Sequence, residues 1–398
     1  MPLYMSEWNF CRYGCFVMAG NRAEFRHNGS GPGLRCRMNT QLLIFKALAI
    51  TDVVLRHKFW PFSSFLFIAS SIPLFLFLSG YFYKPEGELK PLQFIVKKFK
   101  RLMILYFVYN AFYALITYLI FLKKGVVMGS LPNWWNFFIQ PFVDGQQYTL
   151  INPMWFIPFF FLTQLVYMFT SRYIRKLTRD EFVHFLVFAC AGLAAYCLRD
   201  IKMPGYALSQ NFVLKILVGV FFISFGRAFA LKMAAVNIYQ VKFLILALAI
   251  RGALFIEFNS PCYNFAGADF NDLSGLVYSL IDIYTILYLA RIIARFPWVE
   301  QVMSKIGSNT YHIMANHMMV FLVIDAAITG ITGVDPNNPN SDILFYTWPI
   351  YMVAGLGIPT CVGIVSKFLK KRWLTAWTEV YQPGCRRIFA RISGSDQT

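Results

Sequence analysis

The chain has little charge. Only 14% of its 398 residues are Asp, Glu, Lys or Arg, while 58% are apolar and 42 are Phe. A soluble domain usually has about 25% charged residues, because polar side chains must cover its surface. So little polar surface excludes a water-soluble particle, and we predict an integral membrane protein.

Acidic residues are especially scarce: the chain has 19 Asp and Glu against 37 Lys and Arg, a formal net charge of +18. In a soluble protein such an excess would favour nucleic-acid binding. Here the basic residues occur in short clusters between apolar blocks and form no continuous stripe. Clusters of this kind set the orientation of membrane spans, so we expect no nucleic-acid partner.

The sequence also lacks metal-binding and disulfide patterns. None of the eight Cys residues has the Cys-x-x-Cys spacing of a zinc site, and Cys190, Cys197 and Cys361 lie inside apolar runs. His312 and His317 are five residues apart, which places them on different helix faces, unlike the i, i+4 pair of a zinc helix. We expect neither a bound metal nor a disulfide framework.

Apolar blocks recur from about residue 40 to 367, with no long polar stretch between them. A helix needs about 20 mostly apolar residues to cross the roughly 30 Å hydrocarbon layer. By this rule the chain is an all-α, polytopic membrane protein with about ten transmembrane helices. The expected spans are 39–57, 61–83, 103–122, 153–170, 182–199, 212–230, 241–257, 274–296, 307–328 and 345–367.

The basic residues predict the orientation of these spans. With the N-terminus inside, the inner segments and adjoining span ends hold 28 of the 37 Lys and Arg residues, and the outer ones hold six. The positive-inside rule therefore places both termini in the cytoplasm. We expect a cytoplasmic tail over 1–38, unless Met38 is the true start, then a membrane domain over 39–367 and a basic cytoplasmic tail over 368–398.

Ionisable side chains within spans are candidates for function, because each is costly at membrane depth. Lys46 and His57 lie in the first expected span, eleven residues apart. Eleven residues are close to three turns, so both lie on one helix face, about 16 Å apart along its axis. A neutral imidazole can take a proton from a hydroxyl that attacks a carbonyl. The alternative is that His57 only anchors the span at the interface, beside Arg56, Lys58 and Trp60.

Asp52 is five residues from His57, about 140° round the helix, so it cannot orient the imidazole directly. Any orienting partner must come from another span. Four further charged residues lie inside expected spans, where unpaired charges would be too costly. We expect them to form buried pairs, and the spacing leaves open which pairs with which: Lys215, Arg251, Asp282 and Asp325.

Five segments carry polar residues at recognisable spacings. The first is (Lys/Arg)-x10-His, from Lys46 to His57. The others are Phe-x-x-Leu-Ser-Gly-Tyr at 75–81, Lys-x-x-Arg at 98–101, Trp-Phe at 155–156, and Gly-x-Asn-Thr followed by His at 307–317. In this order they resemble the motifs of the acyltransferase-3 family of membrane O-acyltransferases. The resemblance covers about 40–370.

The resemblance implies ten spans with cytoplasmic termini, a coenzyme A thioester donor on the cytoplasmic side, and a carbohydrate acceptor. It implies that His57 is the general base, with a transient acyl-His as a variant. Lys46 would steady a donor phosphate or a developing charge from its place lower on the same helix face.

Further donor-binding candidates follow from the matched motifs. Lys98 and Arg101 are three apart on one helix face, where they could hold the donor's phosphates. The alternative is that they are only a positive-inside signal. Ser79 and Tyr81, with Gly80 between them, could line the pantetheine arm of the donor. Small residues at a helix–helix contact are the alternative explanation.

The acceptor side has three candidates. Trp155 could wall the reaction chamber or stack on a sugar, although a Trp at the outer end of a span is often interfacial. Asn309 and His317 could be polar groups of the chamber, with core packing as the alternative for His317.

We therefore predict an enzyme: a membrane O-acyltransferase that moves an acyl group, taken to be acetyl, from acyl-CoA to a hydroxyl of a cell-surface or exported glycan. Acyl-CoA is a co-substrate, and no bound cofactor is expected. The location expected is a bacterial-type inner membrane. The main alternative is a transporter or flippase of a lipid-linked or exported saccharide. A second alternative is a non-catalytic scaffold of a glycan-assembly complex.

Overall fold

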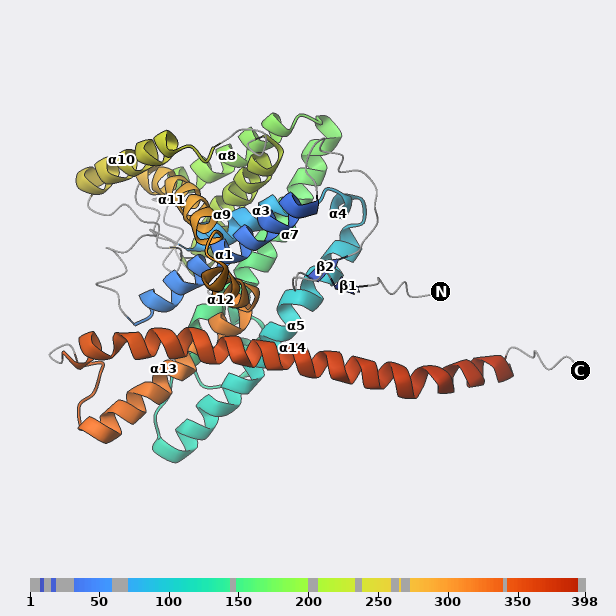
Figure 1. Ribbon diagram of the computed structural model, residues 1–398, viewed down its shortest axis with the longest axis vertical. Helices are drawn as coiled ribbons and strands as arrows, with labels where there is room; N and C mark the ends of the chain where they lie inside the picture. Colours follow the sequence, from blue (N-terminus) through green and yellow to red (C-terminus); the bar gives the residue numbers. More distant parts are fainter. Residues whose placement is uncertain are drawn as a thin grey trace, which may run out of the picture.

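The computed structural model describes residues 8–10, 16–18, 32–58, 71–143, 148–199, 207–232, 238–258, 265, 273–338 and 342–392. Apart from one short β-hairpin, every element in these ranges is helical (Figure 1). The hairpin pairs β1 (Trp8–Phe10) with β2 (Phe16–Met18) in antiparallel register, with Asn9 opposite Val17.

The helices follow in chain order, and most are long enough to be membrane spans or parts of them. They are α1 (Pro32–Arg56), α3 (Ile72–Tyr81), α4 (Glu86–Leu89), α5 (Pro91–Lys124), α6 (Trp134–Phe138), η1 (Gln140–Phe142), η2 (Thr149–Trp155), α7 (Phe156–Leu177), α8 (Glu181–Leu198), α9 (Ala207–Lys232), α10 (Val241–Phe258), α11 (Leu273–Ile293), α12 (Pro297–Ser308), α13 (Thr310–Thr332) and α14 (Ile343–Ile392).

Within the described ranges, seven helices are long and apolar enough to cross a bilayer, against the ten spans expected. They are Pro91–Lys124, Thr149–Leu177, Glu181–Leu198, Asn211–Lys232, Leu273–Ile293, Thr310–Thr332 and Ile343–Trp373. The expected spans 39–57 and 241–257 form as α1 and α10, and each carries three charged residues. The expected span 61–83 lies partly outside the described residues, and α3 covers its second half.

Helix α1 lies at the centre of the bundle, in contact with α3, α11, α12, α13 and α14 (Figure 1). Its apolar side chains are buried all round the helix, as expected of a helix surrounded by others. This central position places both Lys46 and His57 among other helices. The fully buried apolar residues of α1 are Ile44, Phe45, Ala47, Ala49, Ile50 and Val54.

Three glycines let two helix pairs, α3 with α9 and α1 with α12, touch backbone to backbone. A Cβ on Gly80 of α3 would lie 1.8 Å from the carbonyl oxygen of Ile223 in α9, and one on Gly226 would lie 2.0 Å from that of Phe77. A Cβ on Gly307 in α12 would likewise lie 1.9 Å from the carbonyl oxygen of Leu43 in α1. Close contacts between small residues are how helices associate where lipid gives no hydrophobic driving force.

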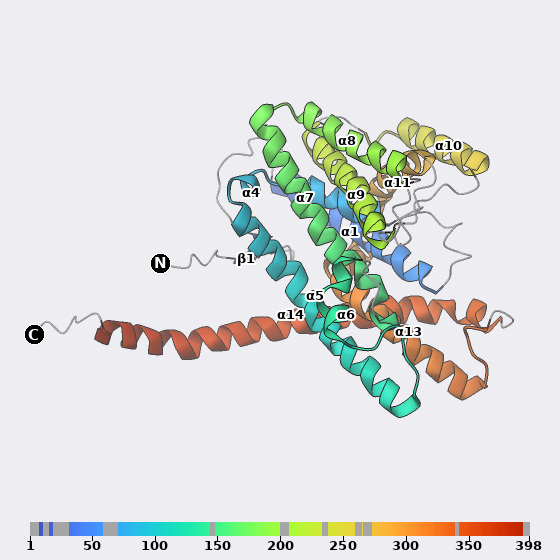
Figure 2. The same cartoon turned by 180° about the vertical axis from the view of Figure 1, so that it is seen from behind.

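Helix α5 has two unlike faces. One face is exposed and apolar, which suits contact with lipid; the other is buried and polar, and faces the protein. Figure 2 shows α5 running beside α7, with which it is in contact. The exposed residues are Ile104, Val108, Phe112, Leu115, Leu119 and Leu122, and the buried ones include Tyr106, Asn110, Tyr113 and Thr117.

Helix α14 is one continuous helix of 50 residues, about 75 Å long at 1.5 Å per residue. It extends well past the other helices in both views (Figures 1 and 2). Its first part is the last expected span. The segment 368–392, expected as a basic tail, continues this helix without a break.

Candidate active site

His57 and His317 lie against each other. His57 directly follows the last residue of α1, and His317 lies on α13. Their ring centroids are 5.1 Å apart, with 47° between the ring planes. His57 is exposed, whereas His317 is fully buried. The structure thus joins two site residues that are 260 positions apart in the sequence.

The hydrogen bonding of His317 fixes its tautomer. Its Nδ1 lies 2.8 Å from the carbonyl oxygen of Ile313, one turn earlier on α13. Because a carbonyl can only accept, Nδ1 of a neutral ring must carry the hydrogen and Nε2 must carry a lone pair. That Nε2 is buried and has no hydrogen-bond partner among the described residues. A buried, unpaired acceptor therefore lies on the ring that contacts His57.

Lys58 anchors the end of α1 to α13 and α14. Its Nζ lies 2.7 Å from a carboxylate oxygen of Asp325 on α13 and donates to Oδ1 of Asn337 at 2.8 Å. It also lies 4.8 Å from the ring centre of Tyr351 on α14, whose hydroxyl donates to Asp325. These contacts fix the position of the residue next to His57.

Asp52 does not contact His57, as its spacing predicted. It accepts a hydrogen bond from Nε of Arg56 at 2.9 Å, one turn later on the same helix. Both carboxylates near the end of α1, Asp52 and Asp325, are thus engaged with basic side chains.

Three cations gather at the other end of the site. The charges of Lys46 on α1 and Lys98 on α5 each interact with Arg101 on α5. Lys98 also donates to Oε1 of Gln164 on α7, and the Nζ of Lys46 lies 5.8 Å from the ring centre of Phe82. Among the described residues, none of these cations has a carboxylate partner. Cations without a carboxylate partner are candidates for binding an anionic ligand.

Ser79 and Tyr81 lie at the end of α3, and Tyr81 is linked to Lys46 through one aromatic ring. Ser79 is half-buried. The ring of Tyr81 lies 5.3 Å from that of Phe82, the ring over which Lys46 lies. Gly80 uses its lack of a side chain for contact with α9. The small residue of this motif therefore serves helix packing, while Tyr81 lies beside the ring that Lys46 contacts.

Trp155 is buried at the end of η2, a segment that packs against α13. The Nζ of Lys215 on α9 lies 4.7 Å from the centre of its ring, a cation–π contact. An interfacial anchor would be exposed to the headgroups. The burial of Trp155 favours a place in the interior instead.

Asn309 holds the joint between α12 and α13. Its Nδ2 donates to the carbonyl oxygen of Lys305 at 2.7 Å, and its Oδ1 accepts from Nζ of Lys367 on α14 at 2.7 Å. Both ends of the amide are thus used within the protein. These bonds indicate a structural role for Asn309: it fixes the start of α13, the helix that carries His317.

The four charged residues expected to form buried pairs do so in part. Arg251 and Asp282 pair with each other, Nε to Oδ1, at 2.9 Å. Asp325 pairs with Lys58, a residue that we had interpreted as interfacial, and Lys215 lies over Trp155.

Two polar networks were not found from the sequence. In the first, the hydroxyl of Tyr109 on α5 lies 2.7 Å from Nδ1 of His312 and accepts from Nδ2 of Asn316 at 3.0 Å, while Tyr113 donates to Asn316. Tyr109 and Tyr113 on α5, like His312 and Asn316 on α13, are four residues apart and so share a face of an otherwise apolar helix. This spacing is the signal that could have found them.

The second network surrounds Glu88 on α4, which is buried. Its carboxylate accepts from the hydroxyls of Tyr83 and Ser171 at 2.9 and 2.8 Å, and from Nε of Arg175 at 2.8 Å. Arg175 also donates to Glu181 at 2.9 Å. A fully bonded carboxylate of this kind ties α4 to α7 and α8. A lone Glu in a polar segment gives no such signal in sequence.

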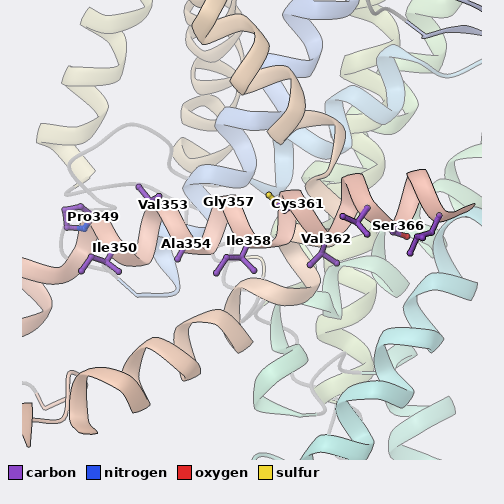
Figure 3. A pocket seen from close by; sticks show the side chains of 11 residues that line it. Pro349, Ile350, Val353, Ala354, Gly357, Ile358, Cys361, Val362 and Ser366 are labelled. Atoms are coloured by element: carbon purple, nitrogen blue, oxygen red, sulfur yellow. The ribbon is translucent and has the colours of Figure 1, made fainter. Parts of the chain in front are cut away.

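A groove of about 1120 Å³ runs along α14 (Figure 3). Its lining is almost wholly apolar, from Pro349 to Leu369, and includes none of the histidines or cations described above. Side chains of this kind suit lipid and offer nothing for acid–base chemistry. In the part of the chain that the structure describes, no three His, Cys, Asp or Glu residues lie close enough to hold a metal ion.

A family model described as an acyltransferase domain, Acyl_transf_3, matches residues 44–368. This range runs from the middle of α1 to the middle of α14, and it includes the histidine pair and the three cations. No curated protein and no solved structure matches the chain.

Proposed function

The chain belongs to the acyltransferase-3 family, and on that premise we propose that it transfers an acetyl group from acetyl-CoA to a hydroxyl of a cell-surface or exported glycan. The apolar helices make it a membrane protein. In this proposal the donor binds from the cytoplasm, the membrane is a bacterial-type inner membrane, and His57 is the general base.

The arrangement of α1 carries this proposal. Lys46 and His57 lie about 16 Å apart along one helix, as eleven residues require. Each contacts protein groups: Lys46 lies near Arg101 and Phe82, and His57 lies against His317. Helix α1 would therefore connect an anion-binding site around Lys46 to a general base at His57.

The cation cluster suits the phosphates of coenzyme A. Lys46, Lys98 and Arg101 come from two helices, and none has a carboxylate partner in the described ranges. Charge-assisted hydrogen bonds from Lys and Arg to phosphate are about twice as strong as neutral ones. An extended pantetheine arm would then carry the thioester from these phosphates toward His57, past Ser79 and Tyr81.

The reaction needs a base at the thioester. His57 removes the proton of the acceptor hydroxyl as its oxygen attacks the thioester carbonyl, which forms a tetrahedral intermediate. The intermediate collapses by breaking the carbon–sulfur bond, and the thiolate of coenzyme A takes the proton from the imidazolium. Attack by His57 itself, through a transient acyl-His, gives the same products.

The acceptor side of the proposal depends on Trp155 and the groups near it. Its indole is buried beside α13 and could stack on a sugar ring. The ammonium group of Lys215, 4.7 Å from the centre of the Trp155 ring, would add a hydrogen-bond donor for the hydroxyls of the sugar. The exposed side chain of His57 is the group that an incoming hydroxyl would meet.

One assay tests the proposal: purified protein in nanodiscs, radiolabelled acetyl-CoA and cell-envelope glycan. Wild type should transfer label and His57→Ala should not, apart from residual transfer at least ~100-fold slower. The matched control is His184→Gln, at a buried histidine on α8 that bonds the carbonyl of Thr178 at 3.2 Å. Undiminished transfer by His57→Ala would remove His57 from the mechanism. Saccharide uptake into vesicles without label transfer would favour a transporter.

A further inference from the structure

We propose that His317 is a positioning residue for His57: its Nε2 accepts a hydrogen bond from the ring N–H of His57 and so fixes which nitrogen of His57 is free to act as a base. This inference rests on the proposed role of His57. It concerns a residue that touches neither the donor nor the acceptor.

The tautomer of His317 is the first step. Its Nδ1 donates to the carbonyl oxygen of Ile313 at 2.8 Å, so its Nε2 is an acceptor. That atom is buried and has no partner among the described residues. Leaving a buried polar atom unpaired is costly, so a donor is expected there in the working enzyme.

Only one contacting ring can supply that donor. Within the described part of the chain, the rings in contact with His317 are those of His57 and Phe321. Phe321 has no N–H or O–H group. His57 carries an N–H in either neutral tautomer.

The spacing of the two rings fits the bond. Two imidazoles joined by N–H···N need centroids about 5 Å apart, which is two ring radii plus a donor–acceptor distance of about 3 Å. The observed separation is 5.1 Å. Rotation of the exposed His57 ring about its Cβ–Cγ bond would point a ring N–H at Nε2 of His317. The backbone next to His57 stays in place during this rotation, since Lys58 is held by its ion pair with Asp325.

The usual orienting group, a carboxylate, is engaged elsewhere. Asp52 bonds to Arg56 at 2.9 Å, and Asp325 bonds to Lys58 at 2.7 Å. The Nε2 of His317, by contrast, is an unpaired acceptor on the ring that contacts His57. The full burial of His317 also suits this role. The exposed His57 would meet the acceptor hydroxyl, and the buried His317 would contact His57 but not the hydroxyl.

The bond would have a defined effect on the chemistry. With one ring N–H of His57 bound to Nε2 of His317, the other nitrogen of His57 must carry the lone pair that takes the hydroxyl proton. When His57 becomes imidazolium, the same bond to a neutral acceptor stabilises its charge. No proton moves to His317, and no further reactant is needed.

Two substitutions of His317 separate this role from packing. His317→Phe keeps a ring of similar shape but removes the acceptor, and His317→Gln keeps an amide oxygen near the place of Nε2. We expect kcat to fall roughly 100-fold in His317→Phe, within the range that a positioned base contributes, with the KM for acetyl-CoA unchanged. His317→Gln should retain most of the activity. Equal losses in both variants, or a loss expressed as a raised KM, would contradict the proposal.

A spectroscopic readout makes the test independent of turnover. The chain has five His residues, so the protein labelled with ¹⁵N-histidine in nanodiscs gives a countable set of ring signals, assigned by single substitutions. Wild type should show His317 with hydrogen on Nδ1 and His57 in one tautomer. His317→Phe should show His57 in both. A His57 ring already mixed in wild type, or unchanged by His317→Phe, would overturn the proposal even if His57→Ala abolishes transfer. Active His57→Ala protein would instead overturn the proposed function.

Discussion

The two ends of the site differ in how their basic residues are paired. Beside His57, Arg56 bonds to Asp52 and Lys58 bonds to Asp325, so each cation has a carboxylate within 3 Å. Around Lys46, the cations Lys98 and Arg101 have no carboxylate partner in the described ranges. The first end is thus tied into the protein by ion pairs, and we propose that the unpaired cations at the second end bind an anion.

The largest expected effect comes from breaking the paired end. Asp325→Asn removes the charge that Lys58 faces, and both side chains are largely buried, with 7% of Lys58 and 18% of Asp325 exposed. Removing one partner of such a pair typically costs at least ~3 kcal/mol, because the other charge stays buried. We expect this loss in reversible unfolding in mixed micelles.

The control for this prediction is the apolar double variant Lys58→Met with Asp325→Leu, which should regain much of the stability, because it leaves no unpaired charge. Its transfer rate should stay low if the anchor positions His57. Full stability in Asp325→Asn alone would show that the ion pair is not an anchor.

A smaller effect is expected at the unpaired end. Lys46→Ala removes a cation without leaving a carboxylate unpaired, so stability should change little. Lys98→Ala also takes the donor from Oε1 of the buried Gln164, so we expect a modest loss of stability in that variant. The KM for acetyl-CoA should rise about 10-fold in each, equivalent to about 1.4 kcal/mol, near the lower end for a hydrogen bond to a charged group. This KM is measured by steady-state kinetics at a fixed glycan concentration.

Lys97→Ala is the matched control for Lys98→Ala. Lys97 is exposed, one residue away on α5, and contributes equally to the positive-inside signal. Its substitution should leave the KM within about twofold. Similar effects of the two substitutions would mean that the basic cluster only sets topology.

The smallest expected effect lies between the two ends, in the network of α5 and α13. Tyr109→Phe removes a hydroxyl that contacts His312 and Asn316 at 2.7 and 3.0 Å. Net loss of such bonds costs about 1 kcal/mol each at most, and the neighbours can bond to each other in part. Thermal unfolding should show a small drop with kcat and KM unchanged. A large fall in kcat would place this network in the reaction path.

Part of this comparison could be predicted from the sequence. The spacing of Lys46 and His57 fixes their common helix face, because that depends on the period of one helix alone. The spacing of Lys98 and Arg101 likewise predicts that these two residues share one face of their helix. The family and the helical membrane fold also follow from motifs and composition, and both are confirmed.

The partners across helices could not be predicted. Lys58 looked interfacial because its nearest sequence neighbours are Arg56 and His57, and nothing local shows that Asp325 lies beside it. The contact of His57 with His317 depends likewise on how α13 packs on α1. A single sequence gives the period of each helix but not the neighbour that each face meets. Seven of the ten expected spans form helices that are long and apolar enough to cross a bilayer within the described residues.

The central claim is that α1 joins a donor site to a base, and one variant tests both parts in one sample. Acetyl-CoA binding and single-turnover transfer are measured on His57→Ala in nanodiscs. The account predicts a dissociation constant within about twofold of wild type, because the cations are untouched, and transfer at least ~100-fold slower. Transfer at the wild-type rate, or loss of donor binding together with transfer, would contradict it.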